Sequence, residues 1–77
     1  MNFEINESGR IWLRPLLTGE MSINYSGSGR VVDVFLAVCH PEKSYWHHGT
    51  HAVVIKSHFV WEAILELGKA SKQINLD

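Results

Sequence analysis

The chain has 77 residues, 45% of them hydrophobic, and its seven Lys and Arg residues nearly balance its eight Asp and Glu residues. This apolar fraction excludes a disordered chain, and the near-neutral charge lacks the basic excess that nucleic-acid binders usually carry. A chain this short folds as one domain, residues 1–77, with a small core that a partner chain or a metal could reinforce. Cys39 is the only cysteine, so an internal disulfide is excluded.

The N-terminal sequence MNFEINESGR lacks the basic and apolar regions of a signal peptide. The longest apolar run, Val34 to Cys39, is far shorter than the ~20 residues of a membrane-spanning helix. A single free thiol is typical of a reducing compartment. We therefore expect a cytoplasmic protein that does not enter a membrane.

The first half of the chain alternates short apolar segments with glycine-containing turns. Turn signals occur at Ser8-Gly9, Thr18-Gly19 and the SGSG run at 26–29. Strands are predicted between these turns, over 2–6, 10–17 and 21–26. Pro15 cannot donate a ladder hydrogen bond, so the second strand should bend or lie at an edge.

The segment from Arg30 to Cys39 predicts a central strand, because its apolar residues divide into two alternating sets. One set is expected to form the central core together with two residues of a C-terminal helix: Val32, Val34, Leu36, Ile64 and Leu67. The other set includes Val31, Phe35 and Ala37 and leaves the second sheet face apolar. A β-branched run over 52–56 predicts the next strand.

The C-terminal third has the period of a helix. Ser57 is a candidate N-cap, because its hydroxyl can accept a free amide of the first turn. One apolar face then follows at a spacing of 3.6: Val60, Ala63, Ile64, Leu67, Ala70 and Ile74. The predicted fold class is therefore α+β, a small meander-like antiparallel sheet of four to five strands with one C-terminal helix on one face.

Two surfaces in this predicted fold are more apolar than one chain can cover. Trp61 and Leu65 widen the apolar arc of the helix, and Phe35 lies in the middle of the second sheet face. A deeply buried helix would explain the first surface, and a partner would explain both. We expect a homodimer with Phe35, Trp61 and Leu65 as its interface residues, the sheet face being the favoured seam.

The stretch SYWHHGTH, 44–51, concentrates histidines and aromatic residues in a predicted connection between strands. Five residues could ligate zinc: Cys39, His40, His47, His48 and His51. No C-x-x-C pair or helical H-x-x-x-H pair accompanies them, so neither a metal nor another cofactor is expected. Cys39 could be a nucleophile with a histidine base, but no catalytic motif supports it. A non-enzymatic protein is therefore expected.

The interpretation that we favour for this stretch is a recognition loop over 41–51. Its binding residues would be Lys43, Tyr45, Trp46, His47, His48 and His51. Tyrosine and tryptophan give large contact areas at low entropic cost, and loops on a rigid sheet often carry binding residues. The alternative is that Trp46 folds back and covers one end of the core. The expected function is an interaction module that binds a protein or small-ligand partner.

Single-stranded nucleic acid is the alternative ligand, because a sheet face with aromatic residues and nearby cations can stack bases. The aromatic residues outside the helix are Trp12, Tyr25, Phe35, Tyr45 and Trp46, and the nearby cations are Arg10, Arg14, Arg30, Lys43 and Lys56. The segment from Arg30 to Leu67 resembles the core of the transcriptional coactivator family of dimeric single-strand binders. RVVDV is similar to that family's central strand, HPEK to the following turn and HAVVIKSHFVW to the last strand and helical tryptophan, here Trp61. The resemblance implies a dimer. This chain departs from it at Val38 and Cys39, where an aromatic residue would stand, and in its histidines, where a basic loop would stand.

Overall fold

The computed structural model describes residues 1–49, 51–71 and 73–75, the last three by their backbone alone. Its described part contains six strands, two α-helices and one short 3-10 helix. They follow one another as β1 Asn2–Ile5, β2 Gly9–Pro15, β3 Met21–Gly27, α1 Arg30–Val38, β4 Ser44–His47, β5 Ala52–Ile55, η1 Ser57–Phe59, α2 Val60–Ala70 and β6 Gln73–Asn75. The predicted α+β class is confirmed, with an antiparallel sheet and a C-terminal helix packed against it.

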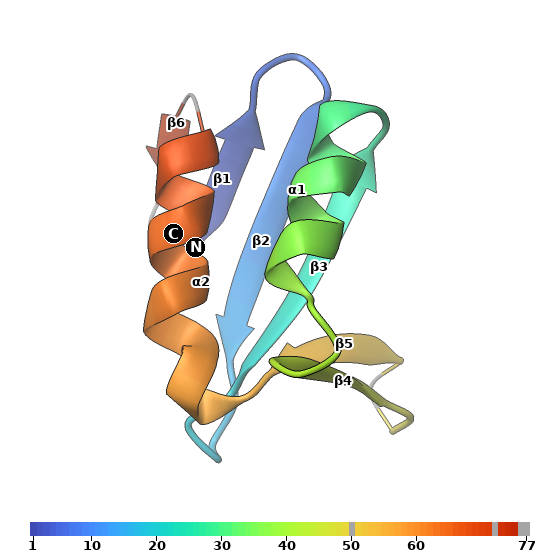
Figure 1. Ribbon diagram of the computed structural model, residues 1–77, viewed down its shortest axis with the longest axis vertical. Helices are drawn as coiled ribbons and strands as arrows, with labels where there is room; N and C mark the ends of the chain where they lie inside the picture. The colour runs from blue at the N-terminus through green and yellow to red at the C-terminus, as the bar shows by residue number, and fades with distance from the viewer. Residues whose placement is uncertain (50, 72, 76–77) are drawn as a thin grey trace.

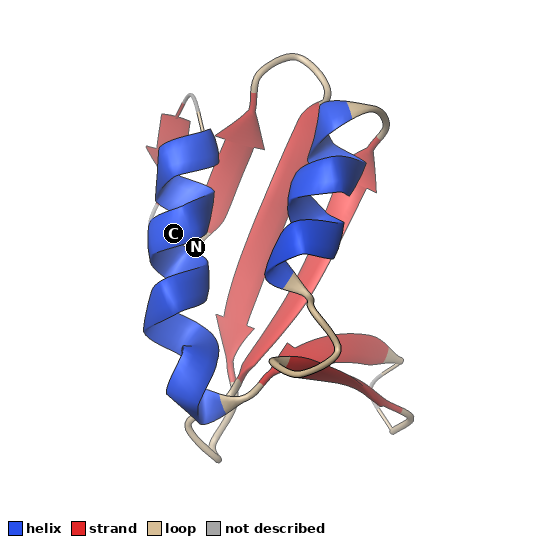
Figure 2. Ribbon diagram, viewed as in Figure 1, coloured by secondary structure: helices blue, strands red, loops and turns tan. Residues whose placement is uncertain are grey.

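The sheet order is β4-β5-β3-β2-β1-β6, and every neighbouring pair is antiparallel. Figure 1 shows α1 and α2 side by side on one face of the sheet, while the β4–β5 hairpin crosses one end of β3. Figure 2 shows the same two layers, helices in front and strands behind. Within the described residues, no helix is long and apolar enough to cross a membrane.

Strands β1, β2 and β3 form a meander whose turns require glycine at two facing positions. Gly9 pairs with Gly27, and both have positive φ angles, 153° and 117°. A Cβ atom added to Gly27 would lie 2.1 Å from the carbonyl oxygen of Ser8, and one added to Gly9 would lie 2.0 Å from that of Ser26. The two backbones therefore approach too closely for any side chain.

The prediction of a strand over Arg30–Cys39 is wrong, because the segment forms helix α1. Its buried residues Val31, Phe35 and Val38 follow helical spacing and face the sheet. Valine-rich runs of this length fit either period, and packing against β2 and β3 decides between them here. RVVDV is therefore helical, and the resemblance to the central strand of the coactivator family fails at this position.

Helix α1 receives its N-terminal cap from the β1–β2 turn. The Val31 amide donates to the Ser8 hydroxyl oxygen at 3.1 Å, and that hydroxyl donates to the Ile5 carbonyl at 2.7 Å. The Ser8 side chain thus satisfies one of the amides that a helix leaves without an internal partner. This contact ties the start of α1 to the meander.

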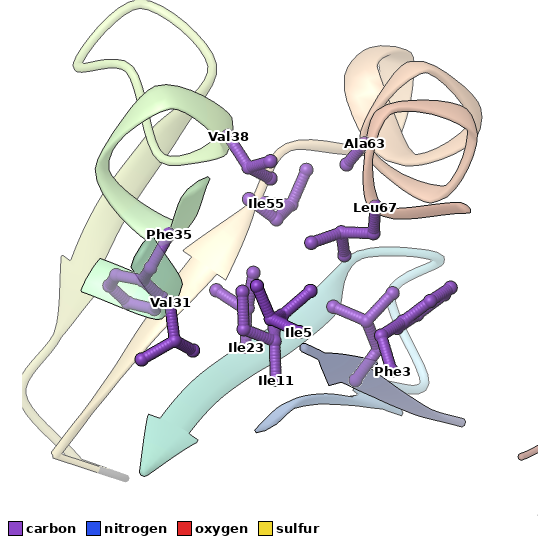
Figure 3. Close-up of a cluster of buried hydrophobic side chains, with 11 residues drawn as sticks. Phe3, Ile5, Ile11, Ile23, Val31, Phe35, Val38, Ile55, Ala63 and Leu67 are labelled. Carbon is purple, nitrogen blue, oxygen red and sulfur yellow. The ribbon is translucent and has the colours of Figure 1, made fainter. Parts of the chain in front are cut away.

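The core lies between the sheet and the two helices, as Figure 3 shows. It is built from Phe3, Ile5, Ile11, Leu13, Ile23, Val31, Phe35, Val38, Ile55, Ala63 and Leu67. Leu67 was correctly predicted, and Val32, Val34 and Ile64 pack against the cluster as half-buried residues. The prediction for Leu36 is wrong: its side chain is 64% exposed, because the helical period turns it away from the sheet.

Helix α2 begins at Val60 after the 3-10 turn and ends at Ala70. Ser57 makes no side-chain capping bond there; the turn begins after Lys56 instead. Ile74 was predicted on the apolar face of this helix but belongs to strand β6, which pairs with β1. That final strand brings the described sheet to six strands, more than the four to five that the sequence predicts.

Candidate binding face on the uncovered side of the sheet

The face of the sheet opposite the helices carries the alternate residues of each strand. In β2, Ile11 and Leu13 are buried toward the helices, so Arg10, Trp12 and Arg14 project from the other side. Both helices lie on the core side in Figures 1 and 2, so neither helix covers this second side. We call this surface the open face.

Trp12 lies at the centre of the open face. In the antiparallel register it stands opposite Asn2 of β1 and Asn24 of β3, so an asparagine flanks it on each side. The ring is half-buried, and the Arg10 guanidinium carbon lies 5.1 Å from the ring centroid. This cation–π geometry holds a planar, positively charged group over a planar aromatic surface.

Two shallow hollows lie on either side of Trp12 and share both Trp12 and Arg14. The first, of about 240 Å³, is lined on its outer side by Ser22, Asn24 and His51. The second, of about 280 Å³, is lined by Asn2 and by residues near the chain start. Because Arg14 is exposed and belongs to both hollows, it can reach a ligand in either one.

The asparagine in the first hollow is oriented by the backbone. Its side-chain oxygen accepts a hydrogen bond of 2.8 Å from the Tyr25 amide. The amide nitrogen of Asn24 is therefore the group that remains to donate toward a ligand. Together with Ser22 and the arginines, it gives the open face hydrogen-bond donors around an aromatic centre.

The predicted binding residue Tyr45 lies at one end of the sheet and is held by an acidic residue of another turn. Its hydroxyl is 3.0 Å from both carboxylate oxygens of Glu20. This hydrogen bond to Glu20 raises the pKa of the Tyr45 hydroxyl. The cross-strand neighbour Val54 is fully buried, so Tyr45 also covers part of the strand beside it.

The three predicted histidines do not gather into one site with Trp46. The Trp46 ring is 50% exposed and makes edge contacts with His48 and His51, each 6.4 Å between centroids. His47 lies 6.5 Å from Tyr45 instead. His51 has a positive φ of 52° and lines the first hollow of the open face. Most of 41–51 is the β4 strand and its turns rather than an irregular loop.

Lys43, the sixth predicted binding residue, points to the helix layer. Its ammonium lies 3.0 Å from a Glu62 carboxylate oxygen and 5.8 Å from the Phe59 ring centroid. It closes one end of a groove of about 310 Å³ between α1 and α2, whose wall also carries Glu66. The predicted binding set is therefore divided between two sides of the molecule.

Neither a metal centre nor a nucleophile emerges from the cysteine and histidines. Across residues 1–49, 51–71 and 73–75, no three His, Cys, Asp or Glu side chains come together in a way that could hold a metal ion. Burial raises the pKa of the Cys39 thiol to about 12. The thiol is therefore protonated at neutral pH, and a protonated thiol is a poor nucleophile.

The predicted interface residues have different environments. Phe35 is buried in the core, 4.6 Å from the Tyr25 ring, so it does not lie on an exposed sheet face. The prediction of a dimer seam on the sheet depends on a strand over 30–39. That segment forms helix α1, so the argument for this seam no longer applies. Trp61 and Leu65 remain exposed on α2, at 74% and 62%.

The sequence prediction names Arg10, Trp12 and Arg14 only among the cations and aromatic residues available to the nucleic-acid alternative, and it does not select Ser22 or Asn24. The signal available for β2 was the alternation in Arg-Ile-Trp-Leu-Arg, which places three functional side chains opposite two aliphatic ones. Whether these side chains are exposed depends on which face of the sheet the helices cover. The sequence predicts a strand over 30–39 where the structure has helix α1, so it does not indicate which face is covered. No family model, curated protein or solved structure matches the chain.

Proposed function

We propose that this protein is a non-enzymatic binding module that binds single-stranded nucleic acid on the open face of its sheet. The observation that carries the proposal is Trp12, which lies under the Arg10 guanidinium with Arg14 one pleat further along the same strand. Single-strand binders combine an aromatic surface for bases with cations for the phosphate backbone.

The charge distribution supports this choice of face. Arg10 and Arg14 project from the open face, where Glu4 is the acidic residue opposite Arg10 in the register. In the groove of the helix layer, the Glu62 carboxylate is paired with the Lys43 ammonium at 3.0 Å, and the Glu66 carboxylate lies 3.8 Å from the Lys69 ammonium. The cation of that groove is therefore already engaged by a carboxylate, whereas Arg14 is exposed beside both hollows of the open face.

The two hollows adjoin each other at Trp12 and Arg14, which favours an extended ligand over a compact one. They measure about 240 and 280 Å³. An extended chain that lies across both can contact Trp12 and both arginines at once.

Fluorescence anisotropy with a labelled oligothymidylate at low salt tests this function. Replacing Trp12 by Leu keeps an apolar side chain but removes the stacking surface. Since stacking contributes ~1–3 kcal/mol per base, affinity should fall about tenfold or more. Trp12→Phe should retain most of the affinity, and the matched control Trp46→Leu, a half-exposed tryptophan outside the two hollows, should leave it unchanged. Absence of oligonucleotide binding in the unmodified protein would reject the proposal.

A second candidate function is the protein or small-ligand interaction expected for Lys43, Tyr45, Trp46, His47, His48 and His51. The observation that favours it is the half-exposed indole of Trp46 on the β4–β5 hairpin. Salt separates the two functions, because phosphate contacts weaken steeply with salt concentration and an apolar contact does not. Trp46→Ala should leave oligonucleotide affinity unchanged if the open face is the site.

We also propose that the chain forms a homodimer and resides in the cytoplasm. The exposed Trp61 and Leu65 on α2 support a helix-side seam. The unpaired Cys39 thiol suits a reducing compartment. A seam on α2 would leave the open face available for a ligand, because the helices lie on the opposite side of the sheet.

A further inference from the structure

We infer that the open face holds two successive nucleotides of a single strand that crosses β3, β2 and β1, with one base in each hollow beside Trp12 and the linking phosphate at Arg14. This inference rests on the proposed function and specifies the length and placement of its ligand. It follows from the way in which the two hollows share residues.

The first step is the shared lining. Trp12 and Arg14 belong to both hollows, whereas Asn24 lines only the hollow on the β3 side and Asn2 only the hollow on the β1 side. Asn2, Trp12 and Asn24 form one cross-strand row in the register. A ligand that fills both hollows must therefore run across the strands and pass Arg14 between its two halves.

The second step is the spacing. Neighbouring strands lie ~4.8 Å apart and β2 lies between β1 and β3, so groups held over β1 and β3 are separated by roughly 10 Å. Stacked bases in a duplex are only ~3.4 Å apart along each strand. Two bases in these hollows would therefore be unstacked from each other and rest on protein groups instead, an arrangement that a single strand can adopt.

The third step is the chemistry at each position. The linking phosphate carries one negative charge, and Arg14 is the cation common to both hollows. A guanidinium can donate two parallel hydrogen bonds to phosphate oxygens. The Asn24 amide nitrogen can donate to an acceptor on a base edge, because its oxygen is occupied by the Tyr25 amide. Every base presents such acceptors, so we expect little preference among bases.

The experiment is a length series measured by isothermal titration calorimetry at low salt, with thymidine monophosphate and oligothymidylates of two, three, four and eight nucleotides. The dinucleotide should bind at least about tenfold more tightly than the monophosphate, because it alone fills both hollows and places its linking phosphate at Arg14. From two to eight nucleotides, affinity should increase only by a statistical factor, the number of overlapping dinucleotide positions that the longer oligonucleotide offers.

Arg14→Gln tests the phosphate contact, and Arg30→Gln is the matched control, since Arg30 is an exposed arginine at the start of α1 on the helix side. Arg14→Gln should weaken dinucleotide binding about tenfold and reduce the salt dependence of the affinity. Arg30→Gln should change the dinucleotide affinity less than twofold. Unfolding midpoints of both variants report whether the fold is intact.

The outcomes separate the inference from the function on which it rests. If none of the oligonucleotides binds, the proposed function fails and the inference with it. If binding occurs but strengthens strongly beyond two nucleotides, the function stands and the two-nucleotide site is wrong. If Arg30→Gln weakens binding as much as Arg14→Gln, the phosphate does not lie at Arg14.

Discussion

Replacing two adjacent residues of α1 distinguishes a helix from a strand at this position. Phe35 is 8% exposed and lies in the core, whereas Leu36 is 64% exposed. A strand over 30–39 was predicted to bury Leu36 and to leave Phe35 on the opposite face. If the segment is a helix, alanine at Phe35 should lower the free energy of unfolding much more than alanine at Leu36. If the segment is a strand, the order should be reversed.

The magnitudes follow from the burial. Truncating a buried phenylalanine to alanine costs ~3–5 kcal/mol, which includes the cavity left behind. Leu36 has only about a third of its surface covered, so its truncation should cost under ~1 kcal/mol, and the higher helix propensity of alanine offsets part of that. At roughly 0.05–0.15 kcal/mol per residue, a chain of this length has a total stability of about 4–12 kcal/mol.

Urea denaturation followed by circular dichroism is the assay. With a slope of ~1–2 kcal/mol per molar urea, Phe35→Ala should lower the midpoint by about 1.5 M or more. Because this variant can approach complete unfolding, Phe35→Leu provides a milder change with an expected cost of ~1 kcal/mol. Leu36→Ala should unfold within about 1 M of the unmodified protein. Equal losses for Phe35→Ala and Leu36→Ala, or a larger loss for Leu36→Ala, would refute the helical assignment.

Four other predictions follow from the structure. Ser8→Ala should cost ~1–2 kcal/mol, since it removes the cap of α1, and an unchanged urea midpoint would contradict that contact. Gly27→Ala should destabilise by more than ~1 kcal/mol, because a Cβ there meets the Ser8 carbonyl at 2.1 Å and φ is positive; a soluble variant with the original midpoint would disprove the close approach. Cys39 should react slowly with iodoacetamide at pH 8 in the folded protein and quickly in urea. The free energy of unfolding should fall as the pH rises from 9, the ordinary thiol pKa, toward 12, the approximate pKa of the folded Cys39 thiol. The reason is that the thiol of the unfolded chain ionises first. Sedimentation at micromolar concentration should give twice the chain mass, and Trp61→Ala with Leu65→Ala should give the single mass; a monomer before substitution would exclude this seam.

The parts of the fold that local sequence determines were predicted well. The β2–β3 hairpin alternates strictly, and the apolar spacing from Val60 to Leu67 fits one helical face. The segment 30–38 was not predictable in this way, because valine favours strands while the spacing of Val31, Phe35 and Val38 also fits a helix. The choice depends on contacts with strands that precede it in the chain.

The error at α1 also concealed the candidate site. A strand over 30–39 leaves one helix to cover the core and makes the second sheet face apolar, which predicts a dimer seam there. With α1 on the same side as α2, the second face instead presents Arg10, Trp12 and Arg14. The stretch 44–51 is rich in histidines and aromatic residues, but the structure divides their side chains into two groups, Tyr45 with His47 and Trp46 with His48 and His51.

The contact between Ser8 and Val31 has a consequence for the order of folding. The residue that satisfies the first turn of α1 lies 23 positions earlier, in the β1–β2 turn. Until that turn has formed, the segment RVVDVFLAV lacks this cap and retains its tendency to pair as a strand. Such a segment, rich in β-branched residues and low in charge, can associate with other chains while it is unprotected. Substitutions that slow formation of the β1–β2 turn are therefore expected to lower the yield of soluble protein.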